Sequence, residues 1–179
     1  GFDQGLDKSS VVILGGTGPV GVASAVSRAK AGANVRLVGR SIEKAEKIVA
    51  ICNDRYQSKN VVAGADADKQ DYLNKADIVL NTGAAGIQLM SDENIQMSSN
   101  LKICADTNAV PPSGIAGVDV MDSGKIMEKS PNKCRGIGAL AIGNVKYKSQ
   151  HECLKLMYTS DDPVYLDFED AFKFAQKSV

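Results

Sequence analysis

Three glycines in the spacing G-x-G-x-x-G, Gly16, Gly18 and Gly21, constrain the fold of this chain more than any other feature. They follow the apolar run 11–14, which is typical of a buried parallel strand, and lead directly into a helical pattern. In this setting Gly16 permits a tight turn, Gly18 leaves room for a pyrophosphate, and Gly21 lets the helix pack closely on the strand. The exposed N–H groups at the start of the helix attract the anion. We therefore predict a dinucleotide site; the alternative is a purely structural glycine-rich turn.

Short β-branched runs alternate with amphipathic stretches along the chain, which is the pattern of a parallel sheet covered by helices. The stretch after the glycines, 20–31, is rich in Ala, Ser and Val and has few large side chains. We predict an α/β fold of the Rossmann type, with a doubly wound parallel sheet in three α/β/α layers. Five runs are predicted to form its strands: 11–14, 35–38, 60–62, 77–80 and 102–105.

Two further helices are predicted from apolar stripes, and we expect both stripes to lie in the core. One lies between the second and third predicted strands and carries apolar residues at helical spacing: Ala45, Ile48, Val49, Cys52 and Tyr56. The other lies near the C-terminus, where Asp167 can cap a helix with an apolar stripe of Phe168, Ala171, Phe172 and Ala175.

Composition and charge narrow the classes of function. The 179 residues, 44% of them hydrophobic, are enough for one globular domain with a sizeable core. The 21 basic residues balance the 21 acidic ones, so the one-sided field that nucleic acid or an anionic membrane requires is missing. The apolar runs are far shorter than the ~20 residues of a membrane span. We therefore expect a cytoplasmic protein that binds neither nucleic acid nor membranes.

The cysteines and the single histidine do not suggest a metal site or disulfides. Cys52, Cys104, Cys134 and Cys153 form no C-x-x-C pair, and a domain of this size needs no disulfide support. We expect free, buried or half-buried thiols. His151 has no cluster of further ligands beside it, so we predict a surface histidine outside the site and no metal.

The residues after the second predicted strand indicate which dinucleotide binds. An acidic residue that would bind the ribose 2′-hydroxyl of NAD is expected there, about 20 residues after the glycines. The chain instead has Gly39, Arg40 and Ser41. A guanidinium can pair with a 2′-phosphate and a serine hydroxyl can donate to it, which favours NADP over NAD. The alternatives are that Arg40 is a solvated surface residue, or that Glu43 binds the ribose.

Small and polar residues also follow the fourth and fifth predicted strands. Thr82, Gly83 and Ala84 come at the carboxyl edge of the sheet, where open α/β sheets bind ligands, so we expect the nicotinamide ribose to lie against them. The alternative is a loop whose glycines serve only to turn the chain. After the fifth strand, the stiff turn 111–114 can hold Asn108 at the same edge.

Taken together, these segments resemble the nucleotide-binding domain of the methylene-tetrahydromethanopterin dehydrogenase family. The resemblance runs from about residue 10 to the C-terminus. The motifs that carry it are 16–21, 39–40, 81–86, 105–115 and 136–143, in the same order and spacing. The later motifs are more specific than the first, which many oxidoreductases share.

The resemblance implies a fold similar to those of methylene-tetrahydrofolate and shikimate dehydrogenases, in which a pterin or other substrate binds between two domains. It implies that residues 10–179 form the NADP-binding domain and that residues 1–9 connect it to an N-terminal substrate domain. The implied reaction belongs to one-carbon metabolism: hydride passes from the methylene group of the reduced pterin to NADP, or in some members NAD, giving the methenyl form. A homo-oligomer is also expected from the family.

By the same resemblance, the first five residues of the turn would hold the pyrophosphate, Arg40 and Ser41 the 2′-phosphate, and Gly83 and Ala84 the nicotinamide side. The full predicted cofactor site is Gly16, Thr17, Gly18, Pro19, Val20, Gly21, Gly39, Arg40, Ser41, Thr82, Gly83, Ala84 and Asn108.

A strong catalytic base is not required, because nitrogen lone pairs already activate the carbon that loses hydride. No catalytic residue is identified. The candidates for orienting substrate or cofactor are Asp106, Asn108 and Lys146. Lys146 is equally well explained as a solvated residue at the start of a helix. Tetrahydromethanopterin and tetrahydrofolate both remain open as the pterin. Two other hypotheses also stay open: an NADP domain of the shikimate dehydrogenase or glutamyl-tRNA reductase type, and an NADP-binding module without catalysis.

Overall fold

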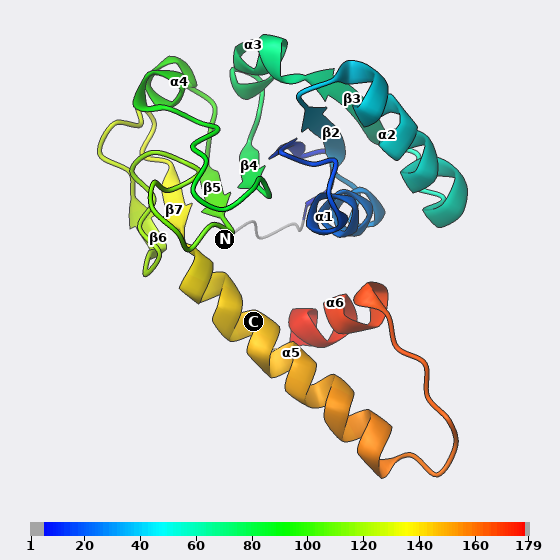
Figure 1. Cartoon of the computed structure of the whole chain (residues 1–179). Helices are drawn as coiled ribbons and strands as arrows, with labels where there is room; N and C mark the ends of the chain where they lie inside the picture. Colours follow the sequence, from blue (N-terminus) through cyan, green and yellow to red (C-terminus); the bar gives the residue numbers. More distant parts are fainter. Residues whose placement is uncertain (1–5, 178–179) are drawn as a thin grey trace.

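The structure, a computed structural model, describes residues 6–177, and its centre is a seven-stranded sheet (Figure 1). The strand order is β3-β2-β1-β4-β5-β7-β6. All five predicted strands are present and pair in parallel, with shifts of one to three residues at their ends. Their bounds are β1 Ser10–Leu14, β2 Asn34–Gly39, β3 Val61–Ala65, β4 Ile78–Asn81 and β5 Ile103–Asp106. The order reverses at β1, so the crevice where such sheets bind ligands lies at the carboxyl ends of β1 and β4.

Two strands at one side of the sheet were not predicted. They are β6 Ser123–Ile126 and β7 Arg135–Ile137. The second pairs in parallel with β5, but β6 pairs antiparallel with β7, so the sheet is mostly rather than wholly parallel. The short, largely exposed edge strand SGKI lacks the apolar run that marks a buried strand, which is why the pattern did not reveal it.

Helices cover both faces of the sheet, so the predicted α/β class and three layers are confirmed. On one face α1 and α2 pack on Val11, Ile13, Val35 and Leu37. The predicted stripe of α2 faces this cluster, with Ala45 and Cys52 fully buried. The helix bounds are α1 Pro19–Lys30, α2 Ile42–Tyr56, η1 Asp66–Asp68 (a short 3-10 helix), α3 Lys69–Leu73, α4 Asp92–Met97, α5 Ala139–Thr159 and α6 Phe168–Lys177.

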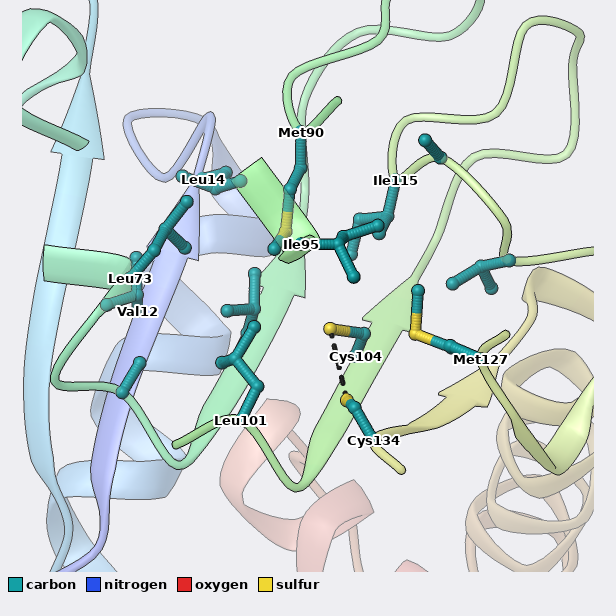
Figure 2. Packing of buried hydrophobic residues seen from close by; sticks show 14 of the residues in the cluster. Val12, Leu14, Leu73, Met90, Ile95, Leu101, Cys104, Ile115, Met127 and Cys134 are labelled. Atoms are coloured by element: carbon teal, nitrogen blue, oxygen red, sulfur yellow. Dashed lines mark hydrogen bonds between the residues drawn. The ribbon is translucent and has the colours of Figure 1, made fainter. Parts of the chain in front are cut away.

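The opposite face is covered by α3, α4 and the loops around residues 90 and 115. Met90, Ile95 and Ile115 fill the space between these segments and the sheet (Figure 2). Cys104 and Cys134 point toward one another in this layer, with their sulfur atoms 3.5 Å apart and hydrogen-bonded. This hydrogen bond and burial together raise the pKa of the Cys104 thiol well above its ordinary value. The prediction of free thiols is confirmed, and three of the four are buried.

The two C-terminal helices extend beyond the sheet. Figure 1 shows α5 extending from the sheet and α6 lying between α5 and α1. Asp167 caps α6 as predicted, accepting from the Glu169 N–H at 2.8 Å. The expectation that its stripe is core was wrong in part. Only Phe168 packs against the sheet's cluster and no α6 residue is fully buried, because Phe172 lies at the edge of α1, beside Arg28.

The predicted connector 1–9 is described only from residue 6; residues 1–5 lie outside the described part. Leu6 packs against the cluster under α1 and α2, and the Lys8 N–H donates to the Gly32 carbonyl. Among residues 6–177 no helix combines the length and apolar character needed to cross a bilayer.

Candidate dinucleotide site

The glycine turn between β1 and α1 forms as its sequence predicts, except that the left-handed backbone of the tight turn falls on Gly15 and not on Gly16. Gly15 adopts a φ of +65°, a conformation that side chains disfavour, and the Gly16 N–H donates to the Val38 carbonyl at 2.9 Å. A Cβ added to Gly21 would lie 2.1 Å from the Gly16 carbonyl oxygen. The start of α1 is thus packed directly on the turn, and only glycine permits this approach.

The mouth of this turn is open. A Cβ added to Gly18 would have no atom within 4 Å, and no side chain caps α1 at this residue. Pro19 takes the first helical position, where its missing N–H costs no hydrogen bond, and Val20 is 55% exposed. Open space in front of free N–H groups at the start of a 12-residue helix is a suitable environment for a pyrophosphate.

Beside the turn, a pocket of about 320 Å³ is lined by Thr17, Arg40, Ser41 and Lys44. Close packing joins it to the turn, since a Cβ on Gly39 would lie 2.7 Å from the Thr17 methyl carbon. Two cations and two hydroxyl-bearing residues around one small space form a donor set that suits a phosphate. Thr17, Arg40 and Ser41 belong to the site predicted from the sequence, and the structure adds Lys44 to them.

The loop after β4 meets the glycine turn directly. A Cβ on Gly15 would lie 2.5 Å from the Gly83 α-carbon. Thr82 anchors this contact, because its N–H and its hydroxyl both donate to the Leu14 carbonyl, at 2.9 and 3.1 Å. Ala84 follows as an exposed residue at the edge. The predicted residues of the two loops are therefore neighbours, with the Thr82 side chain used to hold the loops together.

Asp106, at the end of β5, is engaged entirely within the protein. It is 1% exposed, and its Oδ1 accepts from Asn81 Nδ2 at 2.7 Å and from the Asn108 N–H at 2.9 Å. Its Oδ2 accepts from the Ile115 N–H at 3.0 Å. These bonds make Asp106 a positioning residue that ties the end of β4 to the loop after β5.

Asn108 is also a positioning residue. It is 4% exposed, its Oδ1 accepts from the N–H groups of Gly86 and Val110, and its Nδ2 donates to the Pro112 carbonyl at 2.9 Å. The prediction that the proline turn holds Asn108 at the sheet edge is confirmed. Direct contact of Asp106 or Asn108 with cofactor or substrate stays a prediction.

The third orientation candidate, Lys146, is not brought into this network. It is an exposed residue within α5, whose first residue is Ala139, so the expectation that Lys146 stands at the start of a helix was wrong. The helix begins earlier because Gly138 can sit against the backbone: a Cβ there would lie 2.0 Å from the Asp119 carbonyl oxygen. His151, also on α5, is a surface residue as predicted, and its side chain is 64% exposed.

Asn81 and Gly114 have roles in this network that the sequence did not predict. A Cβ on Gly114 would lie 1.6 Å from Asn81 Nδ2, so this glycine makes room for the amide that bonds Asp106. The Asn81 Oδ1 also accepts from the Gly83 N–H at 3.0 Å, which links the network to the predicted nicotinamide side. In the sequence these two residues are visible only as an asparagine at a strand end and a glycine after two prolines. Neither pattern shows that the two residues are in contact in the folded chain.

The chemistry available at this edge is binding and positioning. Within residues 6–177, no three His, Cys, Asp or Glu side chains gather where they could hold a metal ion. The free donors are the N–H groups at the glycine turn and the cations of the pocket, while the carboxylate of the network has its bonds filled. Such an arrangement can hold a phosphorylated ligand across the carboxyl ends of β1 and β4.

Two curated proteins of Methylorubrum extorquens match nearly the whole chain. The NAD(P)-dependent methylenetetrahydromethanopterin dehydrogenase is 36% identical over 177 residues, which cover 97% of this chain and 59% of that protein. Along nearly its whole length the chain is therefore similar to this dehydrogenase. This confirms the family resemblance read from its motifs. The bifunctional protein MdtA is 37% identical over 169 residues, 93% of this chain and 57% of that protein. The chain thus spans less than two thirds of these relatives. No family model matches it.

Solved structures agree on the fold. Quinate dehydrogenase from Corynebacterium glutamicum in complex with NAD superposes with a TM-score of 0.59, covering 99% of this chain and 57% of that one. At 15% identity this likeness supports the Rossmann-type architecture of the chain and nothing more specific.

Proposed function

We propose that this chain is the dinucleotide-binding domain of a dehydrogenase that oxidises methylene-tetrahydromethanopterin, or methylene-tetrahydrofolate, to the methenyl form by hydride transfer to NADP. One observation carries the proposal: a pocket lined by Arg40 and Lys44 adjoins an open glycine turn, in a chain 36% identical to an NAD(P)-dependent methylenetetrahydromethanopterin dehydrogenase. The reaction would serve one-carbon metabolism.

The residues fit the cofactor by the space they leave. Gly16, Gly18 and Gly21 would admit the pyrophosphate to the N–H groups of α1, and Arg40, Ser41 and Lys44 would hold the 2′-phosphate. NADP, when bound, supplies the acceptor for the hydride. The contact between Gly15 and Gly83 brings the loop after β4 beside the glycine turn, which supports the proposal that the nicotinamide ribose rests against this loop.

The remaining residues would act by orientation. A methylene carbon between two nitrogens releases hydride without a strong base, so a fixed approach of two rings supplies most of what the step needs. Asp106 and Asn108 would provide it indirectly, because their internal bonds fix the loops on which the rings rest. The pterin would bind in a cleft between residues 10–179 and a second, N-terminal domain reached through residues 1–9. The homo-oligomer stays a prediction from the family.

Calorimetric titration of the chain with NADP and with NAD tests the cofactor assignment. NADP is expected to bind about 10-fold more tightly than NAD, a difference of about 1.4 kcal/mol, and Arg40→Ala should remove this preference. The matched control is Arg55→Ala, an exposed arginine at the far end of α2 that should leave both affinities unchanged. If neither nucleotide binds the wild-type chain, the assignment is wrong.

The reaction is tested by adding methylene-tetrahydromethanopterin or methylene-tetrahydrofolate with NADP and following the near-ultraviolet absorbance of the reduced nicotinamide. The assay is run on this chain and on a version extended to the length of the curated relatives. Turnover with one pterin would identify the substrate. Binding of NADP without turnover in either protein would contradict the enzyme assignment and favour a binding module.

A further inference from the structure

Glu43 stands beside the pocket that we assign to the 2′-phosphate and is bonded to one of its lining residues. It lies in the first turn of α2, two residues after the N-cap residue Ser41. The Ser41 hydroxyl donates to Glu43 Oε2 at 2.5 Å and accepts from the Lys44 N–H at 3.2 Å. The only proton of the hydroxyl is therefore committed to Glu43, and no second proton is left for a ligand.

The charge of Glu43 matters as much as its hydrogen bond. Arg40 and Lys44 give the pocket two positive charges, and the Glu43 carboxylate offsets one of them. The hydrogen bond from Ser41 lowers the pKa of the Glu43 carboxyl, so this group is ionised at neutral pH. A 2′-phosphate entering the pocket would meet a like charge and would compete for the Ser41 proton.

A ribose 2′-hydroxyl meets the opposite situation. It carries a proton to donate and no negative charge, so the exposed carboxylate of Glu43 is a partner rather than an obstacle. This is the role that an acidic residue at the end of β2 serves in NAD-binding sheets, displaced here to the first turn of the next helix. Arg40 and Lys44 thus provide two cations for the 2′-phosphate of NADP, and Glu43 provides a carboxylate for the 2′-hydroxyl of NAD.

We propose that Glu43 sets the choice between NADP and NAD: it competes with the 2′-phosphate for the Ser41 hydroxyl and accepts from the 2′-hydroxyl when the phosphate is missing. The inference rests on the proposed dinucleotide binding and adds a specificity determinant to it. Arg40 favours NADP and Glu43 opposes that preference, so the chain accepts both cofactors.

The test is Glu43→Gln, which keeps the size of the side chain and an acceptor for Ser41 but removes the charge. The affinity for NADP should rise about fivefold to tenfold, and the affinity for NAD should stay level or fall, both measured by calorimetry. Glu46→Gln, which alters an exposed glutamate further along α2, is the matched control and should change neither affinity. Circular dichroism verifies that both variants fold.

Two further readouts distinguish competition at Ser41 from a general change of charge. In a Ser41→Ala background the gain from Glu43→Gln should shrink, since the shared hydroxyl is gone. Raising the salt concentration should narrow the difference between wild type and Glu43→Gln, since it screens the repulsion. An unchanged ratio of NADP to NAD affinity in Glu43→Gln, with both nucleotides binding, would overturn this inference alone. Failure of both to bind the wild-type chain would overturn the proposed function with it.

Discussion

Small and polar residues line the whole carboxyl edge of the sheet, but they surround open space on one side and pack against one another on the other side. The open side comprises the ends of β1 and β2, with Thr17, Gly18, Arg40 and Ser41 around unfilled space. The packed side comprises the ends of β4 and β5, with Asn81, Asp106, Asn108 and Gly114 in mutual contact. Polar residues at strand ends are therefore not equivalent. On one side they are available to a ligand, and on the other their bonding capacity is used within the protein.

The difference follows from burial. Asp106 and Asn108 are almost fully buried, and a buried polar group must find its hydrogen bonds inside the protein or incur a cost of about 1–3 kcal/mol. Arg40 is exposed, so water can satisfy its guanidinium until a ligand replaces it. The comparison predicts that substitutions on the packed side lower stability, whereas substitutions on the open side lower ligand affinity.

The largest effect is expected at Gly114. Replacing it with alanine would place Cβ 1.6 Å from Asn81 Nδ2, so the amide must leave its position and Asp106 loses a donor. We expect Gly114→Ala to lower the free energy of unfolding by about 3 kcal/mol or more, measured by urea titration. Gly143→Ala is the control: it lies in α5 with nothing within 4 Å and should stabilise by roughly 0.5–1 kcal/mol. Equal stabilities of the two variants would remove the distinction between the sides.

The next effect is expected from Asp106→Asn. The new side chain can keep an oxygen toward Asn81, but its NH₂ group would then face the Ile115 N–H, and two donors cannot bond. The free energy of unfolding should fall by about 2 kcal/mol, seen as a lower urea midpoint with an unchanged slope. Asp54→Asn, at an exposed position of α2, should stay within about 0.5 kcal/mol of wild type. A neutral Asp106→Asn would mean that the network is not needed for stability.

On the open side, Gly18→Ala should separate affinity from stability. Its Cβ meets no protein atom and its φ of −93° suits alanine, so unfolding should change by less than about 1 kcal/mol. The methyl group would occupy the space assigned to the pyrophosphate, and the affinity for NADP should fall about 10-fold, or about 1.4 kcal/mol. Calorimetry measures the affinity, and thermal unfolding measures the stability. Loss of stability with unchanged affinity would contradict the assignment of Gly18 to the open side.

The smallest effect is expected at the opposite, amino edge of the sheet, where Asp77 tests whether the carboxyl-edge effects are local. Burial raises the pKa of Asp77, but hydrogen bonds from Lys102 and the Ser10 N–H outweigh it and lower the pKa. A lowered pKa stabilises the fold above the unfolded value of about 3.9, and this contribution is lost as pH falls through the folded pKa. Asp77→Asn should therefore cost no more than about 1 kcal/mol at neutral pH.

The pH dependence is the decisive part of that measurement. The difference between wild type and Asp77→Asn should shrink in urea titrations as the pH is lowered below about 4. Nucleotide affinity should not change, since Ser10 and Asp77 lie at the far ends of their strands from the glycine turn. A difference that persists at low pH would show that the charge of Asp77 is not its cause.

Much of the fold was predictable because its signals are local. The apolar run of β1, the glycine spacing and the stripe of α2 each lie within a few residues, and the structure confirms all three. The strands β6 and β7 were missed because they are short and are defined by their partner across the sheet. The α6 stripe was assigned to the core because a stripe reports which side is apolar but not how deeply the helix is buried.

The candidate site divides in the same way. The sequence by itself determined the glycine turn, the cation after β2 and the family resemblance, because these depend on residue type at fixed spacing. Only the tertiary structure decided that Asp106 and Asn108 are bonded internally, that Lys146 stands apart, and that Lys44 joins the pocket. The physical reason is that hydrogen bonding and burial depend on neighbours brought together by folding. Asn81 and Gly114, distant in sequence and in contact in space, are the clearest example.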